Sequence, residues 1–396
     1  MPEPMALSRT LWLVVTTPFA SFVWSLAREL ADARHGSGND ADPWPRRLGV
    51  GSVVVASGAT LGHVLRLARA PEGTTALVEP LGVVAGQPHA GAGLRFDFLS
   101  ATACGLACAV AVAVATFLAT CPARQRSRRL WAWLELALAG GLLSFLADGF
   151  VAVLLGWTAV AAAAAWLAGW TDPRAGAARA TRGGLAIVAL LFGAVSSAGD
   201  GATTASLVAF LVAIAAMSAS TPPAGAPRAL AALGCGAATG LVGPFLLLRL
   251  ADLGSSPHGA ATLVVVAGIV MLGGVGLRAF SGPPGPSRWL ALVGGAPVGV
   301  TCISLGADGE KGGLLVLVSA SLTAALLLLT ADARGLPADA KAARDPESAL
   351  LTHMPEAAGI LLLSFERWVV DAIGGAAVVV ARASAWSLSK IDARRP

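Results

Sequence analysis

Charged residues are scarce in this sequence. Only 13% of its 396 residues are charged and 56% are hydrophobic, whereas soluble domains contain about 25% charged residues. The mean hydropathy is +0.72. These values exclude an ordinary soluble domain and predict a polytopic membrane protein. The net charge of +5 does not indicate nucleic-acid binding, because the arginines are scattered over the expected loops.

The sequence also lacks the motifs of catalytic and metal-binding chemistry. It has no phosphate-binding glycine loop and no Ser-His-Asp set. Its cysteines form no Cys-x-x-Cys pair and have no nearby histidine, so we expect no metal and no cofactor. We expect them to be small buried apolar side chains, and any redox chemistry to belong to partner subunits. The five cysteines are Cys104, Cys108, Cys121, Cys235 and Cys302.

Long apolar runs are what the chain has in abundance. A membrane-spanning helix needs about 20 mostly apolar residues. The sequence therefore predicts an all-α membrane protein, a polytopic bundle of about 11–12 transmembrane helices with an antiporter-like arrangement and broken helices. Eleven candidate spans can be assigned: 8–27, 48–68, 98–120, 130–147, 149–170, 183–199, 203–220, 228–250, 259–280, 288–306 and 312–331.

The charges of the loops between these spans give an orientation. The odd-numbered loops hold fourteen arginines, whereas the even-numbered loops hold three arginines and one lysine. Because short cytoplasmic loops are enriched in Lys and Arg, we expect the odd loops in the cytoplasm and the N-terminus outside. The bacterial inner membrane is the expected location.

The C-terminal part differs from the spans before it. We expect residues 1–331 to form the transmembrane domain and the polar residues 332–350 a cytoplasmic linker. Residues 351–396 alternate apolar stretches with charges such as Glu366, Arg367 and Asp371, so one helix face can stay polar. We predict a helix that lies along the membrane or against a partner, with room for one last span.

Five segments, in order, carry a resemblance to a known family. The sequence resembles the large antiporter-like membrane subunit of respiratory complex I, the NADH–quinone oxidoreductase, in a divergent and shortened form. The segments are Leu94–Ser100, Leu-Arg-Phe-Asp-Phe-Leu-Ser, like the family's L-R-x-D-x-L-S; Phe145–Trp170, like its L-A-D-x-L-L-L-x-x-L-G-W-E hairpin; Ala232–Leu250, like its A-L-I-H-A-A-T helix; Ser287–Ala291, like K-R-V-L-A; and Phe365–Asp371, like F-D-R-x-V-x-D.

The resemblance also implies what has been lost. The family's ionisable proton-path residues fall on side chains that do not carry a proton at neutral pH, and the fifth to eleventh spans hold no Glu, Asp, Lys or His well inside them. A charge at a helix centre costs about 2.5–3.5 kcal/mol, so it persists only where function retains it. The replaced positions are Thr158 (glutamate), Met217 (lysine), Cys235 (histidine), Ser287 (lysine) and Val316, Ala320 and Ala324 (two histidines and a lysine).

A few charged groups remain inside or beside the expected spans. Glu135 lies about one turn inside the fourth span, where we expect it to reach the interface or pair with a neighbouring arginine. Asp148 lies in the turn of the Phe145–Trp170 hairpin, and Asp97 is placed to cap the third span. His63 and Arg66 are placed to reach the outer interface. Glu135 and Asp148 are the residual candidates for moving protons.

Three interpretations follow from this pattern. The first is a structural membrane subunit of a complex I type assembly, with a degenerate proton channel and with other membrane subunits and the lipid bilayer as partners. The second is an active proton or cation translocator that uses Glu135, Asp148 and Cys235. The third is an unrelated small-molecule permease, which the absence of paired charges in broken helices disfavours.

Overall fold

The computed structural model describes eleven stretches of the chain, all within the first of its two units, Met1–Leu336 and Pro337–Pro396. The predicted last span 312–331, the linker 332–350 and the tail 351–396 lie outside the described residues. The described stretches are 5–7, 10–35, 44–71, 74–80, 93–120, 128–169, 173–197, 204–218, six residues of 242–249, 260–281 and 298–303.

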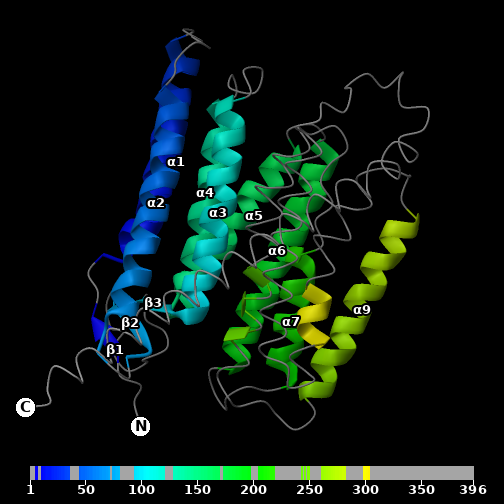
Figure 1. The fold of residues 1–396 in the computed structure, drawn as a ribbon. Coiled ribbons are helices and arrows are strands. Elements are labelled where there is room, and N and C mark those ends of the chain that lie inside the picture. Colours follow the sequence, from blue (N-terminus) through cyan, green and yellow to red (C-terminus); the bar gives the residue numbers. More distant parts are fainter. Residues whose placement is uncertain are drawn as a thin grey trace, which may run out of the picture. The chain divides into compact units, whose positions relative to one another are not determined.

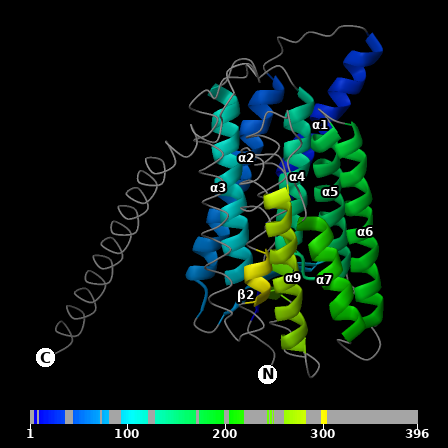
Figure 2. The ribbon, with the colours of Figure 1, turned by 90° about the vertical axis from the view of Figure 1, so that its right-hand side faces the viewer.

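Helices dominate the described part of the chain, as the sequence predicts. In both views α3 to α7 run alongside one another (Figure 1, Figure 2). The helices are α1 (Trp12–His35), α2 (Trp44–Ala68), α3 (Phe98–Thr120), α4 (Arg128–Leu146), α5 (Phe150–Gly169), α6 (Pro173–Ser197), α7 (Thr204–Ser218) and α9 (Ala260–Ser281).

Most of these helices fall on predicted spans, and α6 begins furthest ahead of its predicted start. The sequence predicts the sixth span at 183–199, but α6 begins at Pro173. Proline suits the first turn of a helix because its fixed φ is already helical and its missing N–H has no partner there. Arg174, Arg179 and Arg182 therefore belong to a helix and not to a loop.

Three described helices are long and apolar enough to cross a membrane, with candidate spans Arg47–Ala68, Phe150–Leu167 and Gly176–Ser196. Four shorter apolar helices accompany them: Phe98–Val112, Trp131–Leu146, Thr204–Met217 and Thr262–Gly274. The all-α membrane class is thereby confirmed.

A small sheet, which the all-α prediction does not contain, joins the ends of the first three helices. Its strands are β1 (Met5–Leu7), β2 (Ala76–Pro80) and β3 (Gly93–Asp97), in the order β1-β2-β3. β1 is parallel to β2, and β2 is antiparallel to β3. β3 leads directly into α3, so the sheet fixes the point at which that helix begins.

The sheet also caps the first helix. The backbone N–H of Leu11, beside the start of α1, donates a 2.6 Å hydrogen bond to Glu79 Oε2 on β2. A carboxylate near a helix N-terminus satisfies an unpaired donor and interacts favourably with the helix dipole.

Close helix packing in the bundle depends on glycine. α4 packs against α1, α3 and α5, and α5 packs against α6. A Cβ on Gly140 of α4 would lie 2.7 Å from the carbonyl oxygen of Gly156 on α5, and the reverse distance is also 2.7 Å. Small residues allow such close approach between membrane helices, where dispersion contacts replace the hydrophobic effect.

Candidate functional site

Two of the positions that the resemblance assigns to a proton path, Thr158 and Met217, are described, and only Met217 is buried. Thr158 lies on an exposed face of α5, and its Oγ1 donates a 2.8 Å hydrogen bond to its own helix at Leu154 O. Met217 is 1% exposed, near the end of α7. The other positions, Cys235, Ser287, Val316, Ala320 and Ala324, lie outside the described residues.

Arg179, which is predicted from the sequence to lie in a loop, is a buried residue of α6 that contacts Met217. Arg179 of α6 is 8% exposed, and its Nη2 donates a 2.9 Å hydrogen bond to the carbonyl oxygen of Met217. A cation beside the last carbonyls of a helix satisfies an unpaired acceptor and opposes the negative end of the dipole. The contact therefore stabilises the C-terminal end of α7 with a charge that does not titrate in proteins.

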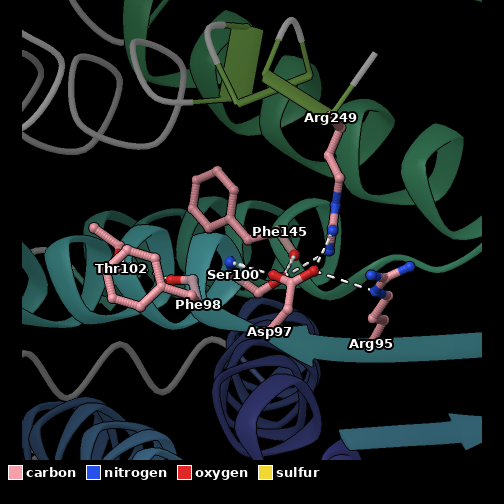
Figure 3. A network of polar contacts seen from close by, with 7 residues as sticks. All are labelled: Arg95, Asp97, Phe98, Ser100, Thr102, Phe145 and Arg249. Atoms are coloured by element: carbon pink, nitrogen blue, oxygen red, sulfur yellow. Dashed lines mark hydrogen bonds and ion pairs between the residues drawn. The ribbon is translucent and has the colours of Figure 1, made fainter. Parts of the chain in front are cut away.

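A second polar group surrounds Asp97, where β3 meets α3 (Figure 3). The N–H of Ser100 donates a 2.9 Å hydrogen bond to Asp97 Oδ1, so the predicted cap of α3 is confirmed. Arg249 forms an ion pair and hydrogen bond with Asp97 Oδ2, and Arg95 Nε lies 3.2 Å from the same oxygen. Burial alone would raise the pKa of Asp97, but Arg249 and the Ser100 hydrogen bonds outweigh it and hold the pKa below its usual value.

Ser100 extends this group to the end of α4. Its hydroxyl donates a 2.8 Å hydrogen bond to Phe145 O and accepts one of 2.8 Å from Arg249 Nη2. The Arg249 guanidinium lies 5.5 Å from the centre of the Phe245 ring, which in turn packs edge-on against Phe145 at 5.1 Å. We call Arg95, Asp97, Ser100 and Arg249 the Asp97 network; it ties β3, α3 and α4 to the 242–249 segment.

Asp148 lies beside this network, next to Gly93. It is exposed in the turn between α4 and α5, as predicted, and its backbone N–H donates a 2.9 Å hydrogen bond to Gly93 O. Leu94 and Ala147 form a β-bridge next to it. The hairpin turn is therefore held to β3 through the backbone.

Glu135 departs from one part of its sequence prediction. Instead of reaching the membrane interface it is 2% exposed, between α4, α1 and α2. Its Oε1 accepts a 2.6 Å hydrogen bond from Ser21 of α1 and a long 3.5 Å contact from Ser52 of α2. Glu135 does not reach the interface, because α1 packs against α4 and covers this face. The side chains of Arg128 and Arg129, its predicted partners, lie outside the described residues.

His63 also differs from expectation. It is buried near the C-terminal end of α2, with Nε2 3.1 Å from Thr10 O and its ring 5.7 Å from that of Phe96. His63 therefore packs against the sheet and is not exposed, whereas the Arg66 side chain is exposed. Cys104, Cys108 and Cys302 are buried, as predicted. Within the described residues no group of His, Cys, Asp and Glu could hold a metal ion.

Comparison with known proteins identifies the class by its fold. No protein-family profile and no curated protein sequence matches the chain. Solved structures do: a chain of the membrane-bound sulfane sulfur reductase, an archaeal respiratory membrane complex, superposes with a TM-score of 0.62 at 16% identity. A chain of the Mrp complex from Dietzia sp. DQ12-45-1b gives 0.62 at 15% identity.

The superpositions cover most of this chain but only part of the others. They include 81% of this chain and 56% of the reductase chain, and 83% of this chain and 38% of the Mrp chain. The protein is therefore a helical membrane protein that shares its fold with subunits of large membrane complexes. The resemblance to antiporter-like subunits is confirmed at the level of fold.

Proposed function

We propose that this chain is a membrane-arm subunit of a complex I type NADH–quinone oxidoreductase, or of a related ion-translocating complex, with a structural role. It would occupy a subunit position, seal the membrane arm and contact neighbouring membrane subunits, with the tail 351–396 as a docking element. The shared fold and the five ordered motifs support this proposal. The bacterial inner membrane and an outside N-terminus belong to the same proposal.

The observation that carries the structural role is the state of the Thr158 and Met217 positions. A proton carrier needs a group that titrates, and neither side chain does so at physiological pH. Thr158 is exposed, and its hydroxyl donates a hydrogen bond to its own helix. Met217 is buried, and its carbonyl oxygen accepts a hydrogen bond from the Arg179 guanidinium. Neither position offers a proton an acceptor on the route that the resembled family uses.

The first prediction tests this route. Replacing Thr158 by valine, which removes the hydroxyl and keeps the shape, is expected to leave proton pumping by the purified complex unaltered. Thr158→Glu is expected to gain no pumping, because the new carboxyl would lie on an exposed helix face, whereas the Met217 position is buried and holds no lysine. Proton uptake into vesicles containing the complex measures both. A loss of pumping in Thr158→Val would contradict the proposal.

The buried Glu135 favours one rival function, an active translocator that uses Glu135, Asp148 and Cys235. The triple variant Glu135→Gln, Asp148→Asn and Cys235→Ala separates the two. We expect unaltered proton flux through the reconstituted complex, because the structural role needs none of these groups to release a proton. A clear loss of flux would replace the structural role by the translocator.

We set aside the permease interpretation, because the chain shares its fold with subunits of two membrane complexes.

A further inference from the structure

The junction of α1, α2 and α4 contains more polar atoms than its hydrogen bonds use. Beside the Ser21 contact to Glu135 Oε1, three buried polar atoms have no hydrogen-bond partner in the described part of the chain. They are Glu135 Oε2, Trp131 Nε1, one turn earlier on α4, and Ser25 Oγ, one turn after Ser21 on α1. We call Ser21, Ser25, Ser52, Trp131 and Glu135 the Glu135 cluster.

Among the described residues, serine hydroxyls and no charged side chain are seen to contact the Glu135 carboxyl. Of the packed neighbours, α3 and α5 contain no charged residue. The nearest charges along α1 are Arg28 and Glu29. Arg28 is seven residues from Ser21, which contacts Glu135, or about 10 Å of helix, and three residues from Ser25.

The charges on α2 also lie toward its ends. Arg46 and Arg47 stand at its start, three and two residues before Gly49, and the Arg47 side chain is exposed. His63 and Arg66 stand near its close, and Ser52 lies between the two pairs. His63 is directed to Thr10 O at the sheet. On α4 itself, Arg128 and Arg129 begin the helix, six or more residues before Glu135.

The packing is shaped to admit the carboxyl. A Cβ on Gly49 of α2 would lie 2.5 Å from Trp131 Cε3 and 3.0 Å from Glu135 Oε1. Only glycine leaves room there for both side chains. The Glu135 cluster is thus enclosed by close helix contact, and a carboxyl is retained within it even though a charge near a helix centre costs about 2.5–3.5 kcal/mol.

We propose that Glu135 is a proton-binding site: it holds a proton on its carboxyl and stands as a neutral acid within the α1–α2–α4 junction. In this form Oε1 is the carbonyl oxygen that accepts from Ser21, and Oε2 carries the proton as a donor. A neutral acid removes the need for a buried counter-charge, which the Glu135 cluster does not supply. The proposal does not require that any proton crosses the membrane.

A protonated carboxyl in a membrane also defines a modification site. Its O–H proton passes to one nitrogen of a lipophilic carbodiimide, and the carboxyl oxygen bonds to the central carbon to give an O-acylisourea. The acyl group then migrates to nitrogen as a stable N-acylurea. The whole reagent is added and no group leaves. We expect dicyclohexylcarbodiimide to modify Glu135, whereas Glu79, which meets the helix end at the sheet, is expected to stay unmodified.

Infrared spectroscopy of the full chain in membranes tests the proposal directly. With ¹³C-carboxyl glutamate incorporated, the wild type at pH 7 is expected to show an isotope-shifted carbonyl band of a protonated carboxylic acid. Glu135→Gln should remove this band. Ser21→Ala should keep it but move it to higher frequency, because the hydrogen bond to the carbonyl oxygen is lost. Thr16→Ala, on the exposed face of α1, is the matched control and should leave the band in place.

An isotope-shifted spectrum that contains only carboxylate bands would overturn the proposal. If Glu135→Gln does not fold, the infrared band is measured on the wild type alone. Peptide mapping of the carbodiimide adduct then identifies the residue that carries the protonated carboxyl. An adduct on Glu135 supports the proposal, and a protonated-acid band with the adduct on another carboxyl overturns it. Proton flux, which tests the structural role, is independent of both measurements.

Discussion

Replacing Arg249 by methionine is expected to lower the free energy of unfolding by about 2–3 kcal/mol, near or below the lower end of the range for breaking a fully buried ion pair. The variant leaves Asp97 buried with Arg95 as its remaining cation partner. It also removes the hydrogen bond to Ser100 and the contact over Phe245. Chemical unfolding in detergent, followed by circular dichroism, measures the change.

The matched control removes both charges of the pair. Asp97→Asn combined with Arg249→Met removes the buried carboxylate that the single variant leaves with Arg95 alone, so it should cost less than Arg249→Met alone. Asn can still accept the hydrogen bond from the Ser100 N–H that caps α3. Equal losses in the single and double variants would show that Arg249 acts through packing and not through Asp97.

The Asp97 network also gives a pH dependence with a defined sign. Because the folded protein holds the pKa of Asp97 below its unfolded value, ionised Asp97 contributes stability above that unfolded value, at about pH 4 and higher. The contribution is lost as the pH falls through the lowered folded value. Arg249→Met should reduce this loss, because less stabilisation remains to be removed.

The parts of the fold that the sequence predicts are those set by local chemistry. The apolar runs predict most of the described helices, and Asp97 three residues before Ser100 predicts the cap of α3. The cysteines lie in apolar runs and are buried. The sequence underestimates α6, because arginine predicts a loop in a membrane protein while Pro173 begins the helix there.

The parts that the sequence does not predict depend on contacts between distant residues. The sequence predicts that Arg249 lies in a loop. In the structure it forms an ion pair with Asp97, which is 152 positions away in the sequence. Ser21 and Glu135 are 114 positions apart. The sheet is missed because its three strands are short and pair with strands that are distant in the sequence. Such contacts follow from which helices pack together, and α1 packs against α4 rather than only against its sequence neighbour α2.

The α4–α5 hairpin should be the part of the bundle most sensitive to added volume. A Cβ on Gly156 would lie 2.3 Å from Ser144 Oγ, 2.7 Å from Gly140 O and 2.8 Å from Ser144 N. Two of these three neighbours are backbone atoms, and the third is held by its own 2.8 Å hydrogen bond to Gly140 O. The helices must therefore separate to accept one methyl group.

Gly156→Ala is expected to lower the free energy of unfolding by about 1–3 kcal/mol, the range for overpacking a close contact. Gly58→Ala on α2 is the matched control, because a Cβ there meets nothing within 4 Å. That control should be neutral or stabilising by up to about 1 kcal/mol, since alanine favours a helix over glycine. Ser144→Ala in the Gly156→Ala background should recover only part of the loss, because the backbone contacts remain. If Gly156→Ala and Gly58→Ala have the same effect on unfolding in detergent, the close approach of α4 and α5 does not limit the stability of the hairpin that carries Thr158.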